Sequence, residues 1–198
     1  MTKQFSAAAE RNSQPILAVL RELLPQPARV LEIGSGTGQH AVYFGAHLPH
    51  VTWQTSDLPQ NHASIHAWMN EANLPNVLLP LTLDTSTPDH WPQEQFDAVF
   101  TANTCHIMSW DEVRAMFSGI TRVLRAGGLA CVYGPFNYGG KFTSESNAVF
   151  DASLKAQAEH MGLRDFEAVD RLAGENGMRL RKDYEMPAHN RLIVWEKS

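Results

Sequence analysis

The chain has 198 residues, of which 43% are hydrophobic and 19% are charged, and its formal net charge is −5. These are the values of a globular protein with one substantial core. The negative net charge argues against a surface that binds the phosphate backbone of a nucleic acid. No apolar run approaches the ~20 residues that a membrane-spanning helix needs, and no apolar leader is evident. The two cysteines, Cys105 and Cys131, have neither the spacing of metal ligands nor that of a disulfide framework. We therefore expect one domain over residues 1–198 that works in the reducing cytoplasm, with no nucleic-acid or membrane partner.

The N-terminal region, residues 1–28, is expected to form a lid followed by a helix. Apolar residues at helical spacing predict that this helix has Pro15 in its first turn and ends before Pro25. The segment ahead of it contains Arg11 and Asn12, which a lid would bring to a ligand. A solvated tail is the alternative.

The first predicted strand, residues 29–33, runs into three glycines on alternate positions. Glu32 is followed by Gly34, Gly36 and Gly38, and glycines let the backbone turn sharply while a ligand approaches it. A dinucleotide fingerprint would carry its third glycine at position 39, and the G-K-S/T end of a phosphate loop is absent. The spacing favours the loop that holds the amino-acid end of S-adenosylmethionine (SAM) in methyltransferases. A glycine-rich turn without a ligand is the alternative.

Acidic residues end the next two predicted strands, residues 51–56 and 77–83. Asp57 is placed to accept hydrogen bonds from both ribose hydroxyls of the cofactor, and Asp84, with Thr85 beside it, to receive the adenine amine. Either acid alone is a common residue at a strand end. Together with the glycine loop they predict a site for SAM and for its product, S-adenosylhomocysteine (SAH). The predicted cofactor-binding residues are Arg11, Asn12, Glu32, Gly34, Ser35, Gly36, Gly38, His40, Asp57, Leu58, Asp84, Thr85 and Asn103.

The fourth predicted strand, residues 96–102, ends in Asn103-Thr104-Cys105-His106. In a parallel sheet this end faces the ligand, so Asn103 and His106 are the predicted catalytic residues. The ordinary pKa of His106 suits a general base, and the alternative is a histidine that only caps or packs. Methyltransferases of exocyclic or amide nitrogens often carry N-P-P-Y here, so we do not predict DNA-base or glutamine methylation. A nucleophilic Cys105 and a metal pair at His62 and His66 are disfavoured, and no metal site is expected.

A helix capped by Ser109 and Glu112 is predicted to run to about Leu124, where Gly127-Gly128 stop it, ahead of a fifth strand at residues 129–133. The loop that follows, residues 134–146, has glycines that allow movement and aromatic side chains suited to a substrate pocket. The predicted pocket residues are Tyr133, Phe136, Asn137, Tyr138 and Asn147.

The tail predicts helices at residues 147–161 and 165–175, then strands at 178–186 and 192–196. The link between these two strands is so short that they must be antiparallel neighbours. The chain is therefore predicted to be an α/β protein of Rossmann-like class I methyltransferase type. It would have a mostly parallel seven-stranded sheet, a C-terminal antiparallel hairpin and helices on both faces.

The sequence resembles a specific family over nearly its whole length: a class I methyltransferase-like group known as domain of unknown function 938, related to the eukaryotic methyltransferase-like 26 proteins. The resemblance implies SAM binding and supplies no substrate. The chain departs from the expected pattern at His189, where we expect Asn. The matching stretches are residues 9–12, 31–40, 56–57, 80–84, 103 with 106–107 and 110, 133–136, 146–147 with 150–151, 162–165 and 186–190.

The resulting hypothesis is a SAM-dependent methyltransferase that acts on a small molecule or a small polar group. The alternatives are a catalytically idle SAM-binding or partner-binding domain, a protein methyltransferase and, least favoured, an NAD-dependent oxidoreductase. The sequence does not indicate the acceptor or the oligomeric state.

Overall fold

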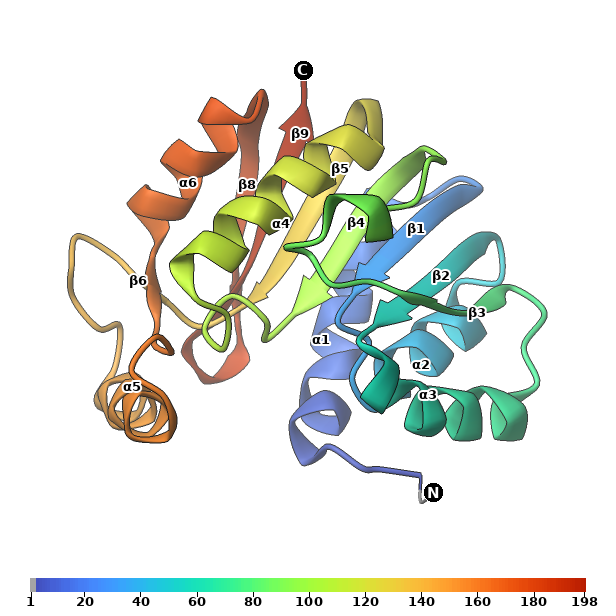
Figure 1. The fold of residues 1–198 in the computed structure, drawn as a ribbon, viewed down its shortest axis with the longest axis horizontal. Helices are drawn as coiled ribbons and strands as arrows, with labels where there is room; N and C mark the ends of the chain where they lie inside the picture. The colour runs from blue at the N-terminus through green and yellow to red at the C-terminus, as the bar shows by residue number, and fades with distance from the viewer. Residues whose placement is uncertain (1–2) are drawn as a thin grey trace.

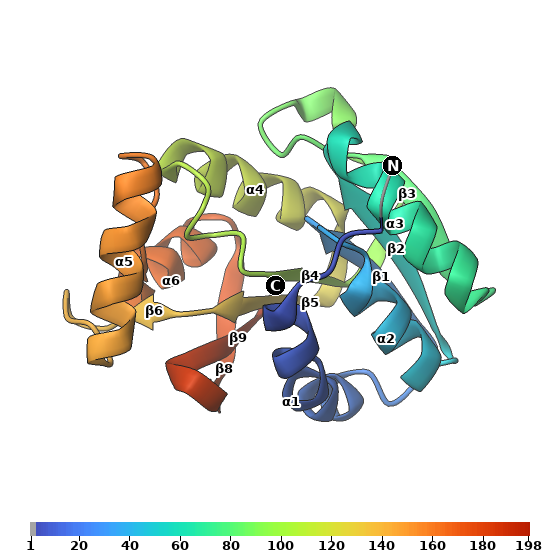
Figure 2. The ribbon, with the colours of Figure 1, turned by 90° about the horizontal axis from the view of Figure 1, so that it is seen from below.

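The computed structural model describes residues 3–198 as a seven-stranded sheet with helices on both faces (Figures 1 and 2). The strand order is β3-β2-β1-β4-β5-β9-β8. The strands of this sheet are β1 (Ala28–Ile33), β2 (Val51–Asp57), β3 (Val77–Thr82), β4 (Phe96–Ala102), β5 (Leu124–Gly134), β8 (Met178–Met186) and β9 (Asn190–Lys197).

Within residues 3–198, six helices accompany the sheet, with α4 and α6 on one face and α1, α2 and α3 on the other (Figure 1). The helix α5 stands beyond the carboxyl ends of the central strands, next to β6 (Figure 2). The helices are α1 (Ala7–Leu23), α2 (Gln39–His47), α3 (Pro59–Ala72), α4 (Trp110–Val123), α5 (Glu145–Gln157) and α6 (Phe166–Glu175), with short 3₁₀ turns η1 (Pro88–His90) and η2 (Pro187–His189).

The strands β1 to β5 run parallel, and β9 lies antiparallel between β5 and β8. The strand order reverses between β1 and β4, so a crevice opens at the carboxyl ends of these two strands, where ligands of such sheets bind. The predicted fold class is confirmed, including the closing hairpin.

Two apolar cores hold the layers together, one on each face of the sheet. Phe117 of α4 meets Trp195 of β9 edge to face at 5.6 Å in one core. Phe44, Trp53 and Phe100 pack within 5.2–5.7 Å of one another in the other core. The central strands are buried on both faces, so their carboxyl ends are held rigidly.

The first helix begins at Ala7, well before the predicted start near Pro15. The Ser6 hydroxyl caps it by accepting from the Ala9 N–H at 3.2 Å, and the run of alanines after the cap favours helix. Pro15 costs one backbone hydrogen bond inside the helix, which packing of the buried Ile16 and Leu20 offsets. Arg11 and Asn12 therefore lie on a fixed helix rather than on a loose lid. Of the predicted lid, Met1 and Thr2 lie outside the described residues.

The helix α4 ends near Leu124, as predicted, but β5 begins earlier than the predicted residue 129. The helix ends at Val123, and Leu124 already pairs with Phe96 in the sheet, so Gly127 and Gly128 lie within β5. The loop at residues 134–146 contains an unpredicted strand, β6 (Phe136–Asn137), which pairs with β7 (Arg164–Asp165). Both departures arise from pairing between distant segments, which local sequence does not encode.

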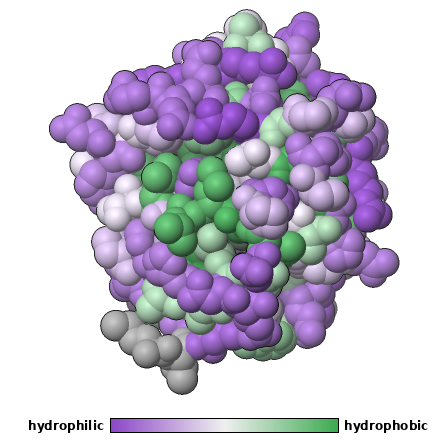
Figure 3. Space-filling model, turned by 90° about the vertical axis from the view of Figure 1, so that its right-hand side faces the viewer, coloured by the Kyte–Doolittle hydropathy of each residue, from purple (hydrophilic) through white to green (hydrophobic). Residues whose placement is uncertain are grey.

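The strand β3 forms one edge of the sheet. Figure 3 shows an apolar area on this side of the molecule, ringed by hydrophilic residues, and Leu79 of β3 is 64% exposed. Pro80 removes one backbone donor from this edge, which limits pairing with another chain. Among residues 3–198, no helix has the length and apolar character that a membrane crossing requires.

Candidate cofactor and acceptor site

The glycine loop follows β1 and has three positive φ angles, +69° at Gly34, +58° at Gly36 and +94° at Gly38. A Cβ at Gly38 would stand 2.9 Å from the Ile65 Cα, so this glycine permits close packing of α3. A Cβ at Gly36 would find no atom nearer than 4.0 Å. The backbone at Gly36 is thus open to a ligand, and a side chain there would fill the space.

Glu32 lies beneath this loop and is 2% exposed. Its Oε2 accepts from the Ser35 hydroxyl at 2.8 Å and from the Trp53 Nε1 at 3.1 Å. Burial raises the pKa of Glu32 to about 7, against the opposing effect of these two hydrogen bonds. The Ser35 N–H donates to the Ser56 carbonyl at 3.0 Å, which fixes the loop to β2. Glu32 therefore shapes the loop and changes charge near neutral pH.

Asp57, at the end of β2, forms a hydrogen bond with the same loop. Its Oδ2 accepts from the Gly36 N–H at 2.6 Å. Its Oδ1 accepts from the Leu58 N–H at 2.7 Å and the Asn61 amide at 2.8 Å. A carboxylate accepts about four hydrogen bonds, so protein groups leave Asp57 room for about one more. The sequence predicted two ribose contacts, and this geometry favours one.

Asp84 and Thr85 follow β3 on the same side. The Leu83 N–H donates to the Asp57 carbonyl at 3.0 Å, which joins the ends of β2 and β3. Asp84 accepts from the Ser86 N–H at 2.9 Å, and Thr85 is 8% exposed. The structure therefore brings the predicted ribose and adenine acids together beside the glycine loop.

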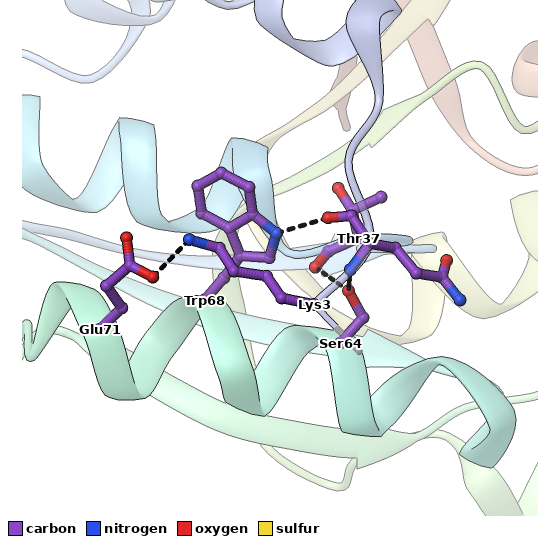
Figure 4. Close-up of polar contacts among 6 residues, drawn as sticks. Lys3, Thr37, Ser64, Trp68 and Glu71 are labelled. Carbon is purple, nitrogen blue, oxygen red and sulfur yellow. Dashed lines mark hydrogen bonds and ion pairs between the residues drawn. The ribbon is translucent and has the colours of Figure 1, made fainter. Parts of the chain in front are cut away.

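Residues 3–6, which we call the strap, cross α3 in front of this loop (Figure 4). The Trp68 Nε1 donates to the Gln4 carbonyl at 2.8 Å, and the Gln4 N–H donates to the Ser64 hydroxyl at 3.0 Å. Ser64 in turn donates to the Thr37 carbonyl, within the glycine loop, at 2.9 Å. The strap is therefore connected to the loop through one hydroxyl group.

Further contacts hold both ends of the strap. Lys3 forms an ion pair with Glu71 at 2.6 Å, and its ammonium stands 3.6 Å from the centre of the Trp68 ring. At the other end, Gln39 accepts from the Ser6 N–H and donates to the Ser6 carbonyl at 3.3 Å. The sequence predicted a lid in this region, but it did not predict the contacts that hold Lys3 and Ser6.

A cavity of about 730 Å³ opens beyond the carboxyl ends of β4 and β5, and we call it the acceptor cavity. Six of the predicted site residues meet there although they come from α1, β5, α5 and the loop after β4. These six are Arg11, Asn12, Asn103, His106, Tyr133 and Asn147. The other lining residues are Ser6, Ala8, Pro15, Pro135, Ser146, Phe150, Pro187, Ala188 and Asn190.

His106 is 5% exposed, and its ring lies 5.2 Å from that of Phe150, edge to face. Burial, and secondarily the positive charge of Arg164, lowers the pKa of His106 to about 4. The imidazole is therefore neutral near pH 7 and its lone pair can accept a proton, but this pKa makes it a weaker base than the ordinary histidine that the sequence predicted. Arg164 also fixes the surrounding loop, because its guanidinium donates to the Cys105 carbonyl at 3.0 Å and to the Met108 carbonyl.

The cavity wall contains unusual backbone. Asn103 has a φ of +60°, and Ala188 and His189 each have a φ of +57°. Such conformations cost energy in residues with a Cβ and concentrate at functional sites. The Asn103 N–H donates to the Tyr133 carbonyl at 2.9 Å, which holds the turn in place. A Cβ on Gly134 would lie 3.7 Å from His106 Nδ1 and 3.8 Å from Asn103 Oδ1, so both predicted catalytic groups flank this glycine.

His40, predicted to touch the cofactor, is 8% exposed and supports Asn12 instead. Its Nε2 lies 2.6 Å from the Asn12 Oδ1, and its ring stacks on Phe44 at 5.3 Å. Burial lowers the pKa of His40 to about 4. Burial also raises the pKa of Tyr133, against a hydrogen bond with Asn12. Asn12 thus sits between two buried groups that fix its position in the wall.

Three predicted pocket residues lie elsewhere. Phe136 is 1% exposed and belongs to the core, because pairing of β6 with β7 turns it inward. The Tyr138 hydroxyl donates to Asp183 at 2.7 Å, and its ring stacks on Phe166. Asn137, like these two, does not line the cavity. The other two, Tyr133 and Asn147, line the cavity, and Asn147 uses its amide to donate to Thr143 and to the His189 carbonyl.

The sequence reading missed several wall residues, among them Phe150, Pro135 and Pro187. All three fall in stretches that carried the family resemblance, which was the available signal. The Cys105 thiol is buried and its pKa is raised to about 12, so it is a poor nucleophile. Within the part of the chain that is described, no three His, Cys, Asp or Glu residues are grouped as metal ligands.

Several solved structures have the same fold. An O-methyltransferase family protein from Burkholderia thailandensis matches with a TM-score of 0.83 at 17% identity, over 94% of this chain and 56% of that chain. An O-methyltransferase family 2 protein from Planctomyces limnophilus, solved with apigenin, matches with a TM-score of 0.84 at 15% identity, over 96% and 58%. CalO1, a methyltransferase of calicheamicin biosynthesis solved with SAH bound, matches with a TM-score of 0.77 at 16% identity, over 94% and 54%.

At these identities the likeness concerns the fold, and the chain spans little more than half the length of these three proteins. A family model described as "Protein of unknown function (DUF938)" matches residues 3–197. The chain therefore belongs to the DUF938 family.

Proposed function

We propose that this protein is a SAM-dependent methyltransferase that acts on a small molecule or a small polar group. One observation carries the proposal: the glycine loop and the acceptor cavity both lie at the carboxyl ends of the central strands. Asp57 holds the glycine loop after β1, and Asn103 and His106 follow the neighbouring strand β4 and line the cavity. The Thr101 hydroxyl donates to the Ile33 carbonyl at 2.8 Å, which couples the ends of β1 and β4.

The residues at the loop fit SAM. The open backbone at Gly36 would admit its amino-acid end, the remaining acceptor position of Asp57 would take a ribose hydroxyl, and Asp84 would receive the adenine amine. Bound there, SAM would supply an electrophilic methyl group on a sulfonium. Leu58, Ser35 and Thr85 complete the proposed contacts.

The chain itself would position the acceptor and exclude water. Asn103 orients the acceptor, and the neutral His106 accepts its proton. The buried position of His106 would keep water from the reacting groups.

The alternatives differ in what they require of the cavity. A volume of about 730 Å³ suits a small molecule better than a docked peptide. The proposal includes a cytoplasmic location, which agrees with the two unpaired cysteines. It also includes kinship with methyltransferase-like 26 proteins.

The proposal is tested by incubating the protein with methyl-labelled SAM and a small-molecule extract of cells. We expect a labelled product, and we expect His106→Gln to lower turnover by ~10²–10⁴-fold because a general base is lost. SAH affinity should be unchanged in that variant. His160→Gln, which alters an exposed histidine outside the cavity, is the matched control. Full turnover in His106→Gln would refute the base assignment, and SAH binding without any labelled product would favour the idle domain.

A further inference from the structure

The wall of the acceptor cavity contains one residue with a formal charge, Arg11. Within residues 3–198 its guanidinium has no hydrogen-bond or ion-pair partner, although it is exposed at the cavity. Ser6, the N-cap of the 17-residue helix α1, lines the same wall, so the positive end of that helix adds to the charge of Arg11. The cavity therefore has a positive potential with five guanidinium donors available.

In the described part of the chain, no carboxylate lines this cavity, although the full sequence carries a net charge of −5. Glu10, next to Arg11 in sequence, faces a different hollow between α1, α2 and α3. Asp151, next to the wall residue Phe150, is 4% exposed and already engaged. It pairs with Lys155 at 2.6 Å and accepts from the Leu163 N–H at 2.8 Å. The positive charge of Arg11 is thus not neutralised by the protein.

Apolar rings form one part of the remaining wall, beside polar side chains such as Asn12 and Asn103. The rings of Pro15, Pro135 and Pro187 line it together with Phe150, which is 38% exposed. His106 meets the Phe150 ring edge to face and is neutral. Aromatic and proline rings favour a planar apolar body by stacking and by removing its surface from water.

From these features we propose that the methyl acceptor is a small planar carboxylic acid whose carboxylate pairs with Arg11 while its ring packs on Phe150. This inference rests on the proposed methyltransferase function. It reassigns Arg11, which the sequence placed with the cofactor, because Glu32, Asp57 and the glycine loop do not line the cavity that Arg11 lines. A guanidinium matches a carboxylate in a bidentate pair, which also fixes the orientation of the acid.

The test uses benzoate, 4-hydroxybenzoate and cinnamate, each compared with its own neutral amide. The affinities are measured by ligand-observed NMR on protein saturated with SAH. We expect at least one acid to bind about tenfold or more tightly than its amide, as one charge-assisted hydrogen-bonded pair provides. In Arg11→Gln this preference should disappear while the SAH dissociation constant stays the same. Arg21→Gln, an exposed arginine on the same helix outside the cavity, should behave as wild type.

Four results would overturn the inference: no acid binds, the amides bind as well as the acids, Arg11→Gln keeps the preference, or Arg11→Gln raises the SAH dissociation constant. The last result would return Arg11 to the cofactor. SAH calorimetry on the wild type is done first. If SAH does not bind, the proposed function fails; if SAH binds and the acids are not preferred, only this inference fails.

Discussion

The charge of Glu32 is set to change within the physiological pH range. Its pKa in the folded protein is about 7 and its ordinary value is 4.5, with burial as the main cause. The protonated form therefore stabilises the free protein below pH 4.5, and this contribution is lost as the pH rises through 7. The ammonium group of SAH, bound at the glycine loop, would have the opposite effect, because its positive charge favours the ionised carboxylate of Glu32.

We therefore expect SAH to bind about tenfold more weakly at pH 6 than at pH 8, since below pH 7 binding must remove a proton from Glu32. Glu32→Gln should show no such dependence. His40 and His106, with pKa values of about 4, do not titrate in this range. Isothermal calorimetry at the two pH values measures the ratio, and an equal pH dependence in wild type and variant would contradict the assignment.

The sequence identified residues whose roles follow from the backbone, and it was weaker on roles that depend on tertiary contacts. Glu32, Asp57 and Asp84 were found because strand ends are readable from the pattern of apolar residues. The support that His40 gives Asn12, and the grip of Asp57 on Gly36, join residues at least 21 positions apart. No local signal encodes such pairs.

At the level of elements, the strap is the segment whose contacts most directly connect the chain terminus with the cofactor loop. Ser64 stands at the junction, since it accepts from Gln4 and donates to Thr37. We expect Ser64→Ala to raise the SAH dissociation constant by about five- to tenfold, because it removes two hydrogen bonds worth roughly 1 kcal/mol together in net terms. The increase should lie mainly in the dissociation rate.

The matched control is Ser153→Ala, whose hydroxyl donates to a carbonyl of its own helix, α5. Stopped-flow displacement of SAH measures the dissociation rates of both variants. Unchanged dissociation in Ser64→Ala would mean that the strap does not retain the cofactor.

Element types were predictable wherever the apolar periodicity was strong, as in β4, for which the sequence predicted both bounds, and in α4, whose capping box is present. The errors fall where a local signal was overruled. Pro15 was read as a helix start, although Ser6 provides the cap. The pairing of β6 with β7, which turns Phe136 into the core, joins segments that neither sequence pattern marks as strand.

For the whole molecule, the alternation of strands and helices was enough to predict the parallel sheet and its antiparallel end. The acceptor cavity was only partly predictable, because its wall gathers side chains from Ser6 to Asn190. Six of its members were identified and the proline and Phe150 surfaces were not. The sequence alone therefore did not indicate which class of molecule the cavity accepts.

The central claim is that the glycine loop binds SAM and its product. Gly36 and Gly139 provide a matched pair, because their φ angles are +58° and +56° and neither would bring a Cβ within 3.9 Å of another atom. Alanine costs similar backbone strain at both positions, but only Gly36 lies in the proposed cofactor site.

Calorimetric titration of wild type, Gly36→Ala and Gly139→Ala with SAH and with NADH tests the claim most directly. We expect the wild type and Gly139→Ala to bind SAH equally and to bind NADH much more weakly. We expect Gly36→Ala to lose about tenfold or more in SAH affinity, because its methyl group occupies the ligand's space. Tight NADH binding without SAH binding in the wild type, or equal losses of SAH affinity in the two variants, would contradict cofactor binding at this loop.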